Sequence, residues 1–173
     1  MAADGGSRDF EDASMSETKF ENQPGWIDVF GPKVKPLTVA DDEHSGYAVL
    51  LGVLDPGVVI PLHSHNDRET FYVLEGAIEG YSRDSWHPLG AGDVFDVPAN
   101  TTHAWRNVSA RQAKMLVVTT TRMGEFLQAI GRPATERTPP TPVDIGTFLT
   151  TAERYGYWLA PSPDNEAVGI FVE

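Results

Sequence analysis

The feature that most constrains this chain is the run from Gly57 to Gly76, which carries two imidazoles and a carboxylate close together. His63 and His65 are separated by one residue, and Glu69 follows just before an apolar stretch. Because side chains alternate between the two faces of a strand, both imidazoles point the same way if the run is extended. Two imidazoles on one face can chelate a single ion, so the run predicts a strand built around a metal site.

A second run, from Gly92 to Asn107, supplies a third imidazole in His103. This imidazole must come from a different strand, which the fold brings close to the first run. Imidazoles and a carboxylate suit a divalent transition metal ion (Fe, Ni, Cu, Mn, Co or Zn) and fit Mg or Ca poorly. Asn107 has two alternative roles: it orients a ligand, or it closes its strand by hydrogen bonding.

Short apolar runs between turn signals continue from Trp26 to Thr121 and predict an all-β sandwich or barrel. The runs are rich in valine, threonine and aromatic residues, as strands prefer, and they cover residues 47–54, 70–74, 94–97 and 115–121. Turn sequences such as Asp55-Pro56-Gly57 separate them.

The pattern changes to helical spacing after Thr121. We expect one helix over 123–130 and a second over 145–155, with Asp144 as the N-cap and Gly156 as the C-terminal stop. Aromatic residues then enrich the tail, and they either pack on the barrel or line a dimer interface: Tyr155, Tyr157, Trp158 and Phe171.

The two histidine-containing runs, 57–76 and 92–107, resemble the first and second signature motifs of the cupin superfamily. The first motif is matched at Gly57, His63, His65, Glu69 and Gly76, and the second at Gly92, Pro98, His103 and Asn107. Asn100 stands where the second motif has glycine, and asparagine also accepts a positive φ. The resemblance implies a double-stranded β-helix (jelly-roll) barrel. It also implies that the metal ligands are His63, His65, Glu69 and His103.

Three parts are therefore expected along the chain: a flexible acidic N-terminal arm (1–20), the cupin β-barrel (21–121) and a C-terminal helical extension (122–173). The arm has the alternative role of docking on a partner subunit. Related barrels commonly dimerise, so we expect a homodimer.

Composition narrows the partners and the location. Acidic residues outnumber basic ones 25 to 13, a net charge of −12, which disfavours binding to nucleic acid. No apolar run approaches the length of a membrane span, and residues 1–20 are polar, so we expect a cytoplasmic protein. With no cysteine in the chain, a metal must be held by nitrogen and oxygen.

Strand alternation places Phe71 and Val73 on the face of Glu69, and Trp105 on the face of His103. These side chains either line an apolar pocket for a small organic substrate or fill the barrel completely.

Within the superfamily, the chain resembles small quercetinase-like (flavonol dioxygenase) cupins in the order of its parts, including the segment 126–134 and Arg154-Tyr155-Gly156. That resemblance implies an O₂-dependent dioxygenase acting on an aromatic or enolisable, flavonol-like substrate. Glu69 would be its catalytic base, with a pKa raised by the apolar pocket. Two alternatives are a non-redox metal-dependent polyketide cyclase or isomerase, and a metal or small-molecule binding cupin without catalysis.

Overall fold

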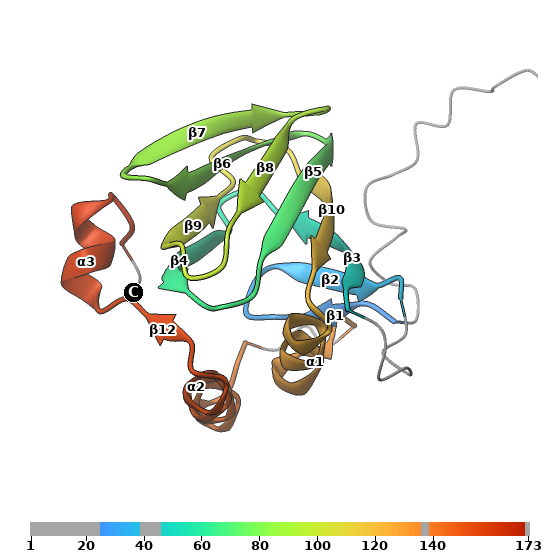
Figure 1. Cartoon of the computed structure of the whole chain (residues 1–173), viewed down its shortest axis with the longest axis vertical. Coiled ribbons are helices and arrows are strands. Elements are labelled where there is room, and N and C mark those ends of the chain that lie inside the picture. The colour runs from blue at the N-terminus through green and yellow to red at the C-terminus, as the bar shows by residue number, and fades with distance from the viewer. Residues whose placement is uncertain (1–24, 39–45, 136–138, 172–173) are drawn as a thin grey trace, which may run out of the picture.

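The computed structural model describes residues 25–38, 46–135 and 139–171, which form two antiparallel sheets closed into a barrel (Figure 1). The larger sheet has the order β11-β1-β2-β3-β10-β5-β8, and the smaller has the order β12-β4-β9-β6-β7. The predicted all-β barrel with a C-terminal helical extension is confirmed. The predicted arm over 1–20 lies outside the described residues.

The strands of the larger sheet are β1 (Ile27–Asp28), β2 (Lys33–Pro36), β3 (Ala48–Leu54), β5 (Glu69–Glu75), β8 (Val94–Val97), β10 (Ala113–Thr119) and β11 (Arg132–Pro133). Those of the smaller sheet are β4 (Val59–Ser64), β6 (Ala77–Ser82), β7 (Ser85–Gly90), β9 (His103–Arg106) and β12 (Trp158–Leu159). The helices are α1 (Thr121–Ile130), α2 (Pro142–Tyr155) and α3 (Ser162–Ala167).

Strand β10 shows why these sequences form sheets. It pairs with both β3 and β5, and its alternate residues Ala113, Met115 and Val117 are buried in the barrel core. Apolar side chains at every second position bury one face of the strand, as an amphipathic strand requires. The predicted strand over 115–121 is shifted, because its last two residues belong to the start of α1 and its N-cap.

Two turns of the motifs depend on a positive φ. Gly76 has φ 80°, and a Cβ there would lie 2.5 Å from the carbonyl oxygen of Gln112, so a larger residue does not fit. Asn100 has φ 61°, so the asparagine adopts the positive φ that was expected where the motif has glycine.

Asn107 closes the end of β9 by hydrogen bonding, which decides between its two predicted roles. Its Nδ2 donates to the carbonyl oxygens of Leu54 (2.9 Å) and Arg111 (2.8 Å). Its Oδ1 accepts from the backbone nitrogen of Ser109 (3.0 Å) and from the Ser109 hydroxyl (2.7 Å). The amide is therefore fully occupied in joining the loop after β9 to the end of β3.

Helix α2 begins earlier than the helix that was expected over 145–155. Thr141, not Asp144, is the N-cap of α2, and Asp144 completes a capping box with it three residues further on. Asp144 was the wrong choice because both residues accept hydrogen bonds from backbone nitrogens at a helix start. Gly156 ends α2 in the left-handed conformation with φ 69°, as predicted.

The extension also contributes strands, which the sequence did not indicate. β11 pairs with β1, and β12 pairs with β4 so that Trp158 lies opposite Ser64 and Leu159 opposite His63. The tail aromatics divide: Tyr157 is buried, whereas Trp158 and Phe171 are 42% and 78% exposed. Among the described residues, no helix is both long and apolar enough to cross a membrane.

Candidate metal centre

Neighbouring strands bring the three predicted imidazoles together. His63 lies in β4 directly opposite His103 in β9, and His65 follows the end of β4. The ring centroids of His63 and His103 are 4.1 Å apart, and those of His65 and His103 are 5.0 Å apart. One ligand nitrogen from each ring lies within 4.8 Å of the others, which is close enough for a shared ion. These three buried or half-buried histidines could bind a metal.

The protein backbone sets the tautomer of all three rings. Nδ1 of His63 donates to the carbonyl oxygen of Pro61 at 2.7 Å, and Nδ1 of His103 donates to that of Thr101 at 2.8 Å. Nδ1 of His65 donates to the carbonyl oxygen of Asp67 at 3.0 Å. A proton held on Nδ1 leaves the lone pair on Nε2, which is how metal-binding histidines are commonly oriented.

Glu69 joins this cluster at the first residue of β5. Its Oε2 lies 3.4 Å from Nε2 of His65 and 3.3 Å from Nε2 of His103, and the carboxylate is buried. The turn after His65 ends where β5 begins, and Glu69 lies on the same side as the histidines, as strand alternation predicted. All four predicted ligands therefore lie together, although their role as ligands stays a prediction.

The donor set passes a test for fit to a cation. Nε2 of His65 and Nε2 of His103 are buried, and among the residues that the structure describes neither has a hydrogen-bond partner of good geometry. Buried polar atoms without partners are rare in folded proteins and call for an explanation. An ion bound by these two nitrogens and the Glu69 carboxylate would satisfy all three groups, and its identity within the transition metals is open.

The groups of the centre change one another's acidity. Burial, together with the electrostatic influence of the neighbouring His103 and His65 rings, lowers the pKa of His63 to about 3, so this ring is neutral at pH 7. Burial alone would raise the pKa of Glu69, but the nearby His103 and His65 rings outweigh it and hold that pKa below its ordinary value. The expected upward shift for Glu69 is therefore wrong, because the two imidazoles beside the carboxylate outweigh its burial.

Phe71, Val73 and Trp105 all face the barrel interior, as alternation predicted. They are at most 7% exposed and belong to one apolar core, with the Phe71 and Trp105 rings 4.2 Å apart. This packing corresponds to the alternative in which they fill the barrel. Their contact with a substrate stays a prediction.

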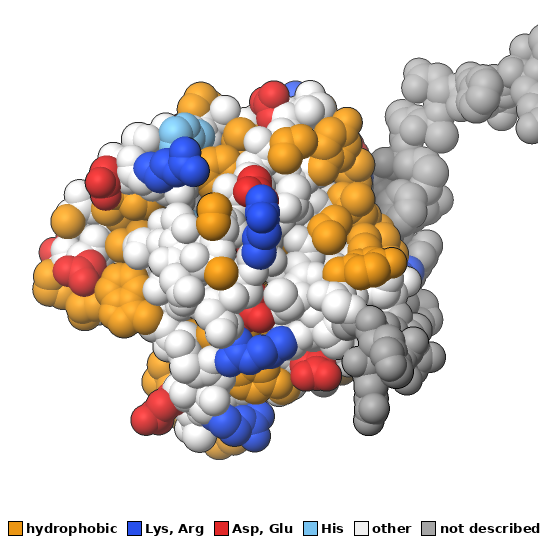
Figure 2. All heavy atoms as spheres, in the orientation of Figure 1, with side chains coloured by type: hydrophobic (Ala, Val, Ile, Leu, Met, Phe, Trp, Pro, Cys, Tyr) orange, Lys and Arg blue, Asp and Glu red, His pale blue; other side chains and the backbone are white. Residues whose placement is uncertain are grey.

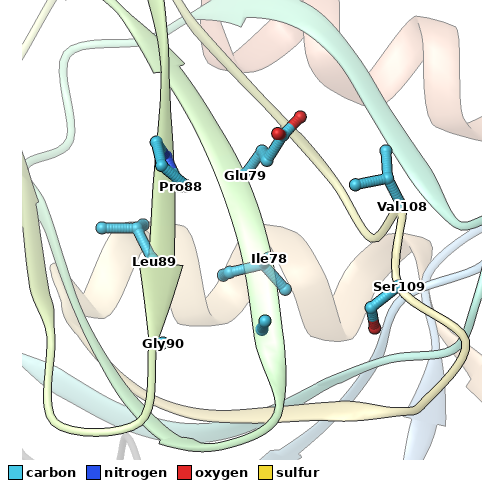
Figure 3. A pocket seen from close by; sticks show the side chains of 8 residues that line it. Ile78, Glu79, Pro88, Leu89, Gly90, Val108 and Ser109 are labelled. Atoms are coloured by element: carbon cyan, nitrogen blue, oxygen red, sulfur yellow. The ribbon is translucent and has the colours of Figure 1, made fainter.

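A separate surface hollow of about 330 Å³ lies between β6, β7 and the loop after β9 (Figure 3). Its lining is mostly apolar, with Ile78, Leu89 and Val108 among the contributors. Its one carboxylate, on Glu79, accepts a 2.6 Å hydrogen bond from Arg106. None of the residues that line this hollow belongs to the histidine cluster.

Sequence reasoning missed three residues beside the histidines: Asp67, Arg122 and Tyr157. Asp67 is 2% exposed and accepts hydrogen bonds from the Tyr157 hydroxyl (2.7 Å) and from Nη1 of Arg122 (2.9 Å). Asp67 lies between the predicted ligands His65 and Glu69 in sequence, and this position could have indicated that it is near the centre. Arg122 and Tyr157 are distant in sequence, and no local pattern connects them to the centre.

Comparison with known proteins identifies the barrel. Residues 50–119 match the family model described as a cupin domain. An acireductone dioxygenase from Leptospira biflexa is 35% identical over 77 residues, which cover 42% of this chain and 41% of that protein. The chain thus spans about two fifths of the length of this curated relative.

Solved structures share the fold at low sequence identity. KdgF from Halomonas sp. superimposes with a TM-score of 0.52 at 23% identity, covering 59% of this chain and 92% of that one. The polyketide cyclase RemF from Streptomyces resistomycificus gives a TM-score of 0.49 at 21% identity, covering 57% of this chain and 69% of that one.

Proposed function

Because residues 50–119 match the cupin domain model, we propose that the chain is a cupin and a metal-dependent enzyme acting on a small organic substrate. The observation that carries the proposal is the pair of buried Nε2 atoms of His65 and His103, which lack hydrogen-bond partners in the described part of the chain and face the same carboxylate. Three imidazoles and Glu69 would leave one or two positions open on a five- or six-coordinate ion. Open positions are typical of reactive centres and not of structural ones.

The residues of the centre have separate tasks in this proposal. When bound, a divalent transition metal ion stabilises negative charge on a substrate oxygen. His63, His65 and His103 hold that ion through Nε2, with each Nδ1 proton tied to a backbone carbonyl. The Glu69 carboxylate accepts a proton from a substrate hydroxyl or enol, which requires it to swing from the imidazoles toward the substrate.

Our first candidate reaction is an O₂-dependent dioxygenation of an aromatic or enolisable, flavonol-like substrate. Two observations support it: the resemblance to quercetinase-like cupins in the segment 126–134, and the sequence similarity to an acireductone dioxygenase. An enolisable substrate also fits a carboxylate that can accept a proton beside a cation.

The test starts with elemental analysis of protein purified without added metal. Apoprotein is then loaded separately with Fe, Ni, Cu, Mn, Co or Zn and incubated with a flavonol such as quercetin, with and without O₂. Oxygen uptake that matches loss of the flavonol absorbance, and that stops under argon, supports the proposal. No uptake with any of these ions contradicts the dioxygenase assignment for flavonols.

The second candidate is a non-redox polyketide cyclase or isomerase. It is favoured by the donor set itself, because three imidazoles and a carboxylate also suit zinc, which has no redox chemistry. Zinc as the native ion, together with turnover that does not need O₂, would select this candidate. Metal and ligand binding without any turnover would leave the binding module, our third alternative.

We further propose that the protein is a homodimer joined through the outer face of the larger sheet. Exposed apolar side chains lie on three neighbouring strands there: Tyr72 and Leu74 in β5, Val94 in β8 and Val118 in β10. Figure 2 shows hydrophobic side chains gathered on this part of the molecule. Charges at the two ends of this face are paired within the chain, Lys114 with Glu75 and Arg68 with Asp96. Because each copy carries a net charge of −12, a face whose charges are paired is where two copies approach with least repulsion.

Sedimentation velocity tests this interface. Val94→Lys should convert the dimer to a monomer, whereas Val143→Lys, at a still more exposed valine in α2, should leave it unchanged. A wild-type protein that is monomeric at high concentration contradicts the dimer. A cytoplasmic location remains a prediction from the sequence.

A further inference from the structure

Asp67 is a buried carboxylate that the proposed chemistry does not use. Its backbone carbonyl accepts the Nδ1 proton of His65, as described above, while its side chain points to the C-terminal extension. There the carboxylate accepts hydrogen bonds from the Tyr157 hydroxyl, from Nη1 of Arg122 and from the Thr120 hydroxyl. One residue therefore connects a candidate metal ligand to the segment that follows the barrel.

Tyr157 contacts both Asp67 and His65. Its hydroxyl holds Asp67, and its ring centroid lies 5.1 Å from that of His65. The next two residues form β12 on the edge of β4, and the nitrogen of Ala160 donates to the carbonyl oxygen of Leu62 at 2.9 Å. The extension thus contacts the strand that carries the histidines through both side chain and backbone.

Arg122, near the start of α1, binds both Asp67 and the end of α2. Its Nη1 bonds Asp67 and also the side-chain oxygen of Asn66 at 2.8 Å, and its Nη2 donates to the carbonyl oxygen of Tyr155. The guanidinium lies over the rings of Tyr155 and Tyr157, 5.1 Å and 5.3 Å from their centroids. The turn between His65 and Glu69 is therefore bonded to both α1 and the end of α2.

We propose that Tyr157, acting through Asp67, is a positioning residue for His65, so that docking of the segment 156–160 and metal binding strengthen each other. The inference rests on the proposed metal centre. Its physical basis is that the acceptor on Nδ1 orients the ring and keeps Nε2 free for the ion. Because coupling between two binding events is reciprocal, the bound ion must also stabilise the docked segment.

Binding of Co²⁺ to the full chain tests the first half of this coupling. We expect Tyr157→Phe to weaken Co²⁺ binding about 10-fold in competition with a chelator, the effect typical of a lost partner behind a metal ligand. At saturating Co²⁺, the visible absorption bands should also change, because they report ligand geometry at the ion. Tyr155→Phe is the matched control: among the described residues its hydroxyl has no hydrogen bond to Asp67, so affinity and spectrum should stay as in the wild type.

Hydrogen exchange on the wild-type protein tests the second half and does not depend on a variant. Co²⁺ should slow exchange of the Ala160 amide, which bonds β4, more than that of the Ile145 amide near the start of α2. If Co²⁺ binds but Tyr157→Phe keeps wild-type affinity and spectrum, the positioning role is overturned while the metal centre stands. Equal effects at Ala160 and Ile145 overturn the reciprocal coupling in the same way, and wild-type protein that binds no metal overturns both proposals.

Discussion

His103 and Asn107 lie at opposite ends of β9 and differ in how their polar atoms are satisfied. Both come from the same motif and are at most 1% exposed. Each polar atom of the Asn107 side chain is hydrogen-bonded within the chain, whereas Nε2 of His103 has no hydrogen-bond partner among the described residues. The difference separates architecture from chemistry, because a buried polar group left open by the fold is where a ligand compensates the cost of burial.

Of the variants that test this difference, His103→Ala should have the largest effect, which is on metal binding. Loss of a whole ligand should weaken metal binding by more than about 100-fold, since losing only a partner behind a ligand costs about 10–100-fold. The fold should remain, because the removed ring makes its one hydrogen bond to a neighbouring turn, at Thr101. Isothermal titration with Co²⁺ measures this effect.

His87→Ala is the control for that measurement, because His87 bonds Ser82 and Ser85 outside the cluster. Wild-type affinity in His103→Ala would remove His103 from the site and end the contrast between the two ends of β9.

Glu69→Gln should separate proton transfer from metal holding. Glutamine keeps the size of the side chain and one oxygen ligand but accepts protons poorly, so turnover should fall by about 10²–10⁴-fold. Metal content should fall much less. Steady-state kinetics on the substrate found above, with metal analysis of the same sample, measures both quantities. Glu125→Gln, on the exposed side of α1, should retain full activity, and full activity in Glu69→Gln would leave Glu69 as a ligand alone.

Asn107→Ala should affect stability and not metal binding. Removing the amide leaves the carbonyl oxygens of Leu54 and Arg111 without their donor, which we expect to cost about 2–4 kcal/mol in the free energy of unfolding. Urea denaturation measures the loss, and the folded variant should still bind one equivalent of Co²⁺. A variant with wild-type stability but no metal would assign Asn107 to the centre instead.

Asp55→Asn should give the smallest effect. Asp55 follows Leu54, whose carbonyl oxygen Asn107 binds, but Asp55 itself is only partly buried. Partial burial raises the pKa of Asp55, but hydrogen bonds from Gln112 and Lys33 outweigh it and place the pKa below its ordinary value of 3.8. A lowered pKa stabilises the fold above pH 3.8, and this contribution is lost as the pH falls through the folded-state value.

At pH 7 the substitution should therefore cost only about 0.5 kcal/mol, because the ion pair is partly solvated. The difference from wild type should disappear in denaturation curves recorded at progressively lower pH. A constant difference at all pH values would assign the effect to packing.

Much of the barrel and of the centre could be predicted from local sequence. Strand alternation placed Phe71, Val73 and Trp105 in the interior, and this prediction succeeded because strand periodicity is a local property that the sequence displays directly. The resemblance to the cupin motifs implied that His63, His65, Glu69 and His103 lie together, as they do.

The failures share a physical cause. β11 and β12 have two residues each, so neither shows a periodic pattern, and each exists as a strand because a partner edge is present. The pKa of Glu69 was misjudged because it depends on which groups surround the carboxylate in space.

The sequence by itself determined the barrel, the turns at Gly76 and Asn100, and which side chains meet at the centre. Only the tertiary structure decided what holds them in place. It showed that Asn107 is satisfied, that two Nε2 atoms are not, and that Tyr157 reaches Asp67 across 90 residues of chain. Strand patterns and motif spacings are local, whereas the satisfaction of a buried polar atom depends on every segment that packs around it.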